Sequence, residues 1–173
     1  MNTRLDPVLS NIDADLPNAL ERLLDLMRLK SISTDPAYKD DCAAAAEWLV
    51  KDLTSIGIDA SIYETPGHPM VMGHIDGPEN SSAPHLVFYG HYDVQPVDPI
   101  ELWAADPFDP QIESTAKGQV IRGRGSSDDK GQLMTFVEAC RAWKVEHGEL
   151  PCEITFFFEG EEESGSPSLV PFM

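Results

Sequence analysis

Two stretches of the chain carry apolar residues at the spacing of an amphipathic helix. Residues 16–30 place leucine or methionine at positions 16, 20, 23, 24 and 27, which lie on one helical face. Residues 41–53 combine an alanine run with acidic residues at the start, and Gly57 follows as a stop signal. The pattern therefore predicts two helices before any strand.

Alternating or continuous apolar runs predict strands later in the chain, over residues 58–63, 69–76, 86–89, 119–122 and 151–158. The first two are expected to pair as a hairpin, and 86–89 and 151–158 are expected to be buried. A third helix is predicted over 133–143, and residues 95–118 read as a long connection without a strand. Strands that alternate with helices in this way indicate an α/β fold.

Composition narrows the class of protein. The chain has 173 residues and a formal net charge of -18, which argues against nucleic acid or an anionic membrane as a partner. It has no leader-like apolar segment behind a basic start and no apolar run of about 20 residues, so a cytoplasmic location is expected. Cys42, Cys140 and Cys152 stand at scattered spacing and are interpreted as small core residues.

His91 and Asp93 follow directly after the predicted strand 86–89. The carboxyl end of a strand in an α/β sheet is a common place for ligands. An imidazole there can bind a metal through one nitrogen while a carboxylate two residues on orients the ring. The alternative is that His91 only ends the strand and Asp93 opens a turn, and the short pattern alone leaves the two interpretations equal.

Two further segments carry carboxylates after apolar runs: Asp128 with Asp129, and the run Glu159 to Glu163. Carboxylates held close together repel one another unless a cation lies between them. Imidazole and carboxylate ligands without thiolates suit zinc, manganese or a similar ion at a catalytic site. The aspartates could instead favour a helix N-terminus, and the glutamates could form a solvated surface.

Three segments together carry a resemblance to a known family. Gly-His-Tyr-Asp-Val-Gln-Pro, Gly-Arg-Gly-Ser-Ser-Asp-Asp-Lys-Gly and Glu-Gly-Glu-Glu-Glu-Ser-Gly-Ser occur in this order. The chain thereby resembles the M20 metallopeptidases, and most of all the carnosinase-like dipeptidases among them. The resemblance implies a three-layer, zinc-exopeptidase-like α/β fold, a mixed sheet flanked by helices. Residues 1–173 would be the N-terminal portion of its catalytic domain, incomplete without the later strands.

The resemblance also implies roles for individual residues. His91 would bind one metal, Asp128 would bridge two, and Glu163 would bind the second. Asp93 would orient His91, Glu162 would be the general base, and the bond from Asp128 to Asp129 would be cis. The implied cofactors are two Zn²⁺ ions, with Mn²⁺ or Co²⁺ as alternatives.

The implied substrate is a dipeptide, and an N-acyl-amino acid is the alternative within the same family. Family members are longer, and their additional length supplies more metal ligands and a lid domain that mediates homodimerisation. The chain alone is therefore expected to bind metal weakly and to be inactive. A truncated, non-catalytic acidic module is the alternative of a different class.

Other polar residues are left without a firm role. Arg122 and Arg124 are expected either to meet a substrate carboxylate or to stabilise their turn. The remaining histidines, at positions 68, 74, 85 and 147, lack the neighbours expected of metal ligands and are assigned no site.

Overall fold

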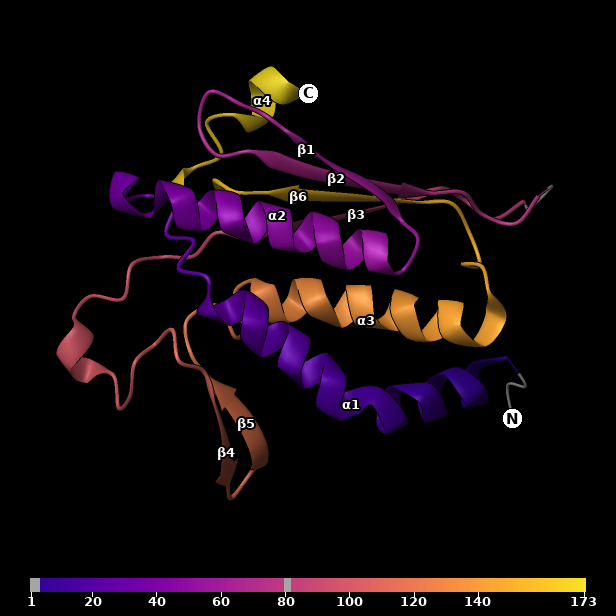
Figure 1. Ribbon diagram of the computed structural model, residues 1–173, viewed down its shortest axis with the longest axis horizontal. Coiled ribbons are helices and arrows are strands. Elements are labelled where there is room, and N and C mark those ends of the chain that lie inside the picture. The colour runs from indigo at the N-terminus through magenta and orange to yellow at the C-terminus, as the bar shows by residue number, and fades with distance from the viewer. Residues whose placement is uncertain (1–3, 80–81) are drawn as a thin grey trace.

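A computed structural model describes residues 4–79 and 82–173, and shows a sheet packed against helices (Figure 1). The longer helices are α1 (Leu5–Arg28), α2 (Lys39–Ser55) and α3 (Lys130–His147), and the short α4 is Leu169–Phe172. The strands are β1 (Asp59–Tyr63), β2 (Met70–Ile75), β3 (Leu86–His91), β4 (Gln111–Thr115), β5 (Gly118–Arg122) and β6 (Ile154–Glu159). The α/β class predicted from the sequence is confirmed.

The main sheet is mixed, with the strand order β1-β2-β6-β3 in the described residues. β1 and β2 form the expected antiparallel hairpin, and β2 is also antiparallel to β6. β3 is parallel to β6, in a register that pairs His91 with Glu159. The carboxyl ends of parallel strands lie at the same end of a sheet. This pairing therefore brings the histidine segment beside the glutamate run.

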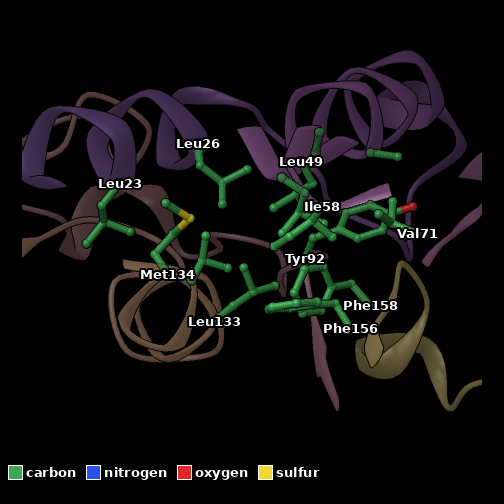
Figure 2. Packing of buried hydrophobic residues seen from close by; sticks show 14 of the residues in the cluster. Leu23, Leu26, Leu49, Ile58, Val71, Tyr92, Leu133, Met134, Phe156 and Phe158 are labelled. Atoms are coloured by element: carbon green, nitrogen blue, oxygen red, sulfur yellow. The ribbon is translucent and has the colours of Figure 1, made fainter. Parts of the chain in front are cut away.

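The core lies between the sheet and the long helices (Figure 2). Leu49 of α2, Leu133 of α3 and Phe156 of β6 are all fully or almost fully buried in it. Phe88 of β3 stacks on Phe136 of α3, with ring centroids 3.9 Å apart. On the opposite face of the sheet, the short helix α4 places Phe172 against Phe157 of β6. Helices therefore flank the sheet, as the resemblance implied.

The expectation that residues 86–89 form a buried strand is wrong. β3 has one strand neighbour, β6, so it lies at the edge of the described sheet. Val87 is 58% exposed, and Leu86 and Tyr89 are also exposed. Its apolar residues were a correct signal for a strand. Burial depends on the neighbouring strands and layers, which a short apolar run does not encode.

The start of the first helix and the connection 95–118 also differ from the sequence-based predictions. α1 begins at Leu5 rather than near residue 16, and Pro17 lies inside it. The connection 95–118 contains β4, which pairs with β5 as a separate two-stranded hairpin. β4 was missed because Gln111–Thr115 is largely polar, and both hairpin strands are mostly exposed. No helix in the described part of the chain is long and apolar enough to cross a membrane.

The cysteines differ sharply in their expected reactivity. Cys42 and Cys140 are buried, and burial raises the pKa of each thiol to about 12, whereas Cys152 is partly exposed. Because the thiolate is the reactive form, we expect iodoacetamide at pH 8 to modify Cys152 alone in the folded chain. Mass spectrometry of the labelled peptides checks this, with a urea-unfolded sample as the control in which all three react. Labelling of Cys42 without urea would contradict the packing.

Candidate metal centre

His91 stands at the last position of β3, and its side chain is 7% exposed. One ring nitrogen, Nδ1, lies 3.2 Å from Oδ1 of Asp93, and the other, Nε2, lies 3.2 Å from Oδ1 of Asp128. Nε2 is also 3.8 Å from Oε2 of Glu162. Both edges of the imidazole therefore face carboxylates.

Asp93 is fully buried and connects three segments of the chain. Its Oδ1 faces His91 and accepts a hydrogen bond from the backbone N–H of Glu162, at 3.2 Å. Its Oδ2 accepts from the backbone N–H of Glu163 at 3.0 Å and from the hydroxyl of Ser33 at 2.5 Å. The carboxylate thus holds the histidine ring and the glutamate loop in fixed relation to each other.

Ser33, which lies between the first two helices, was assigned no role by the sequence analysis. In the structure, Ile32 forms a parallel bridge with Val94, and Ser31 donates its hydroxyl to the carbonyl of Tyr92. These contacts bring Ser33 to Asp93. No local pattern could have revealed the pairing, because the two segments lie far apart in the sequence.

Asp128 and Asp129 lie immediately before α3, and the peptide bond between them is cis, as the resemblance implied. The side chain of Asp128 is 73% exposed, so its carboxylate faces the open side of the site. Oδ2 of Asp129 accepts a hydrogen bond from the backbone N–H of His91 at 3.2 Å. As predicted, this segment follows the strand at 119–122, which the structure shows as β5 of the separate β4–β5 hairpin. The start of α3 brings it to the site.

Glu162 and Glu163 follow β6 in a short 3-10 turn, Glu162–Ser164. The carboxylate of Glu162 points toward His91 and is 45% exposed. The carboxylate of Glu163 instead accepts a hydrogen bond from Nε2 of Gln95 at 2.9 Å. The first members of the run, Glu159 and Glu161, are buried, so the run is not simply a solvated surface.

The charges around His91 favour a cation at this position. Burial lowers the pKa of the imidazole, but the hydrogen bond to Asp93 and the charges of Asp93, Asp129 and Glu162 raise it to about 9. A neutral imidazole has one nitrogen without hydrogen, and here each nitrogen faces a carboxylate oxygen. Either a proton or a metal ion on Nε2 removes that conflict.

The donor atoms fit a metal ion. Ligand atoms of a tetrahedral zinc lie roughly 3.3–3.5 Å apart when the bonds are about 2.0–2.2 Å long. The 3.2 Å separation between His91 Nε2 and Asp128 Oδ1 is close to that spacing. In the described part of the chain, ligand atoms of His91, Asp128 and Asp129 lie within 4.8 Å of one another, whereas Glu163 is outside that group.

The pKa of the Glu162 carboxyl suits a group that first accepts a proton and then returns it. Partial desolvation raises the pKa of its carboxyl, His91 lowers it, and the charges of Glu163, Asp93 and Asp128 raise it further. The net shift is upward, which brings the group nearer to neutral pH. General acid–base catalysts work best when their pKa lies near the working pH.

Arg122 and Arg124 make local contacts. Arg122 pairs with Glu113 across the β4–β5 hairpin, at 3.0 Å. Arg124 donates to the carbonyl of Pro96 at 2.8 Å and its guanidinium lies 5.4 Å from the ring centroid of Trp103. Of the two interpretations, these contacts support the stabilising one.

Comparison with known proteins agrees with this arrangement. Residues 87–172 match the model of peptidase family M20/M25/M40, a span that includes all three site segments. This chain belongs to the M20 family. It is 31% identical to the Cys-Gly metallodipeptidase DUG1 of Candida albicans, over 95% of this chain and 36% of that protein.

Solved structures show the same M20 architecture. The dipeptidase Dug1p of Saccharomyces cerevisiae superposes with a TM-score of 0.87 and 29% identity, over 99% of this chain and 38% of that one. Human carnosine dipeptidase 1 gives a TM-score of 0.81 and 25% identity, over 97% of this chain and 37% of that one. The chain therefore spans little more than a third of the length of these M20 relatives.

Proposed function

We propose that this chain is the N-terminal portion of the catalytic domain of a metal-dependent dipeptidase. The observation that carries the proposal is the shared carboxylate of Asp93, which joins His91 to the backbone of Glu162 and Glu163. It ties a candidate metal ligand to a candidate base. The similarity to DUG1 and carnosine dipeptidase supports a dipeptide as the substrate.

Each residue of the site has a proposed role. His91 and Asp128 would hold one ion, and Asp128 with Glu163 would hold a second, with Zn²⁺ as the proposed metal. When bound, such ions polarise an amide carbonyl and lower the pKa of water. Asp93 keeps Nε2 of His91 directed toward the ion by accepting the proton on Nδ1 in a hydrogen bond.

Glu162 is proposed as the general base. Its carboxylate takes a proton from the attacking water as the new C–O bond forms at the scissile carbonyl carbon. The same carboxyl then gives that proton to the departing amine nitrogen as the C–N bond breaks, so the proton balance closes on the two products. The raised pKa of Glu162 suits both directions of transfer.

Homodimerisation is proposed for the longer protein.

Metal content and dipeptide hydrolysis test the proposal. Both are measured in the 173-residue chain and in the polypeptide extended through the reading frame that encodes it. At the site of His91, Asp128 and Glu163 we expect about two zinc ions, with turnover of dipeptides, in the extended polypeptide, and weak metal binding without turnover in the shorter chain. Faster hydrolysis of N-acyl-amino acids than of dipeptides would make an N-acyl-amino acid the proposed substrate in place of a dipeptide. Absence of metal and of amide hydrolysis in both forms would overturn the proposal in favour of a non-catalytic acidic module.

A further inference from the structure

A second group of possible metal ligands lies at the other end of the sheet. His74 is near the end of β2, His85 comes just before β3, and Glu153 comes just before β6. One ligand atom from each lies within 4.8 Å of the others. β3 separates His85 from His91 by six residues, so the two clusters are roughly 20 Å apart along the strand. The sequence analysis assigned no site to His74 or His85.

The strand pairing explains why these residues meet. β6 is the central neighbour, with β2 on one side and β3 on the other. Thr155 of β6 pairs with His74 of β2 and with Val87 of β3. The pairing of β6 with both β2 and β3 therefore brings three distant parts of the chain together at one end of the sheet.

The distances suit a small transition-metal ion. Oε1 of Glu153 is 3.8 Å from Nε2 of His74 and 3.6 Å from Nδ1 of His85. These separations are a few tenths of an ångström above the roughly 3.3–3.5 Å expected between ligands of a tetrahedral zinc. Oδ1 of Asp76 lies 3.4 Å from Nε2 of His74, but in the described residues Asp76 is outside the group whose ligand atoms all lie within 4.8 Å of one another.

Thr155 orients both imidazole rings. Its hydroxyl oxygen lies 3.2 Å from Nδ1 of His74 and 2.9 Å from Nε2 of His85. A hydroxyl oxygen has two lone pairs and can accept a hydrogen bond from each ring. In that arrangement the other nitrogens, Nε2 of His74 and Nδ1 of His85, carry the lone pairs, and Oε1 of Glu153 lies within 3.8 Å of both. Metal-binding histidines characteristically have such a partner on the nitrogen away from the ion.

Two lone pairs beside a carboxylate favour a cation, and a metal ion would contact both rings and Glu153 at once. The combination of two imidazoles and carboxylate oxygen favours zinc, nickel or copper over magnesium or calcium, which prefer oxygen ligands alone.

We propose that His74, His85 and Glu153 bind one divalent transition-metal ion, with Zn²⁺ as the ligand to be tested. Thr155 positions the two rings. The ion would connect the ends of β2, β3 and β6, and this site is separate from the proposed catalytic centre. The proposal therefore stands or falls independently of the dipeptidase function.

Calorimetric titration of Zn²⁺ into the His91→Ala chain tests the proposal, since this substitution removes the histidine of the other cluster. We expect one ion bound, with affinity lowered at least tenfold when His74 and His85 are both changed to alanine. Thr155→Val keeps the side-chain shape and removes the hydroxyl, so it should weaken binding about 10–100-fold. His147→Ala, which changes a histidine at the end of α3, is the matched control and should leave the affinity unchanged.

Side-chain NMR of the histidine rings identifies where the ion binds. Zn²⁺ should shift the ring signals of His74 and His85 in the His91→Ala chain. His74 and His85 are exposed and lie outside the core, so the variants should keep the circular dichroism spectrum of the parent chain. Equal Zn²⁺ affinity with and without these histidines would overturn the proposal. Failure of the folded chain to bind Zn²⁺ would also overturn it.

Discussion

Glu162→Gln should lower kcat for dipeptide hydrolysis by about 10²–10⁴-fold in the extended polypeptide, while the bound metal remains. Glutamine keeps the shape of the side chain but cannot accept the proton of the attacking water. In the structure the carboxylate of Glu162 lies 3.8 Å from Nε2 of His91, beside the candidate ligands. Initial rates at saturating dipeptide and metal content by elemental analysis are the two measurements.

Glu163→Gln provides the matched comparison, since it replaces a carboxylate oxygen with an amino group in the neighbouring glutamate. A ligand role for Glu163 predicts loss of about one metal ion per chain together with loss of turnover. The opposite pattern, in which Glu162→Gln releases metal and Glu163→Gln does not, would exchange the two proposed roles. Turnover unaffected by either substitution would exclude this loop from catalysis.

Asp93→Asn is expected to weaken both metal binding and the fold. The wild-type carboxylate contacts His91 Nδ1, the hydroxyl of Ser33 and the backbone N–H groups of Glu162 and Glu163. Asparagine has an amino group in place of one of the two carboxylate oxygens. The hydrogen-bond donors that this oxygen accepted from would then face another donor. Each buried donor left without a partner costs about 1–3 kcal/mol in the free energy of unfolding. Loss of the partner of a metal-binding histidine lowers metal affinity about 10–100-fold.

Urea unfolding and Zn²⁺ titration, both in a chain that also carries His74→Ala and His85→Ala, measure the two effects of Asp93→Asn. Ser33→Ala is the control, because it removes one of the donors to Asp93 and leaves the carboxylate intact. Its expected cost is about 0.5–1.5 kcal/mol in the free energy of unfolding. If Asp93→Asn binds Zn²⁺ as tightly as the unchanged chain, Asp93 does not orient a metal ligand.

The sequence was most informative where a local pattern carries the chemistry. The spacing from His91 to Asp93 places both groups at one strand end, and the structure shows the two in contact. The strand predicted over 151–158 was recognisable as buried because continuous apolar residues suit a strand covered on both faces, and the structure has it as β6, Ile154–Glu159. The family resemblance, which rests on three such segments, was confirmed by comparison.

Burial and partners could not be predicted in the same way. β3 has an apolar sequence yet is largely exposed, because its position at the sheet edge depends on strand order. β4 has a largely polar sequence yet is a strand, because β5 supplies its hydrogen-bond partners. Ser33 reaches Asp93 only through the bridge between Ile32 and Val94.

The residue types and local spacing indicated the α/β class and three segments rich in possible metal ligands, and the family resemblance assigned the individual ligands of the first site. The tertiary structure decided which of the charged groups meet. His74, His85 and Glu153 show this most clearly, because each lies on a different strand or beside it and the sequence analysis assigned none of them a site. Their proximity depends on pairing between segments far apart in the chain. Local periodicity reports the secondary structure of a segment and not the partner it will find.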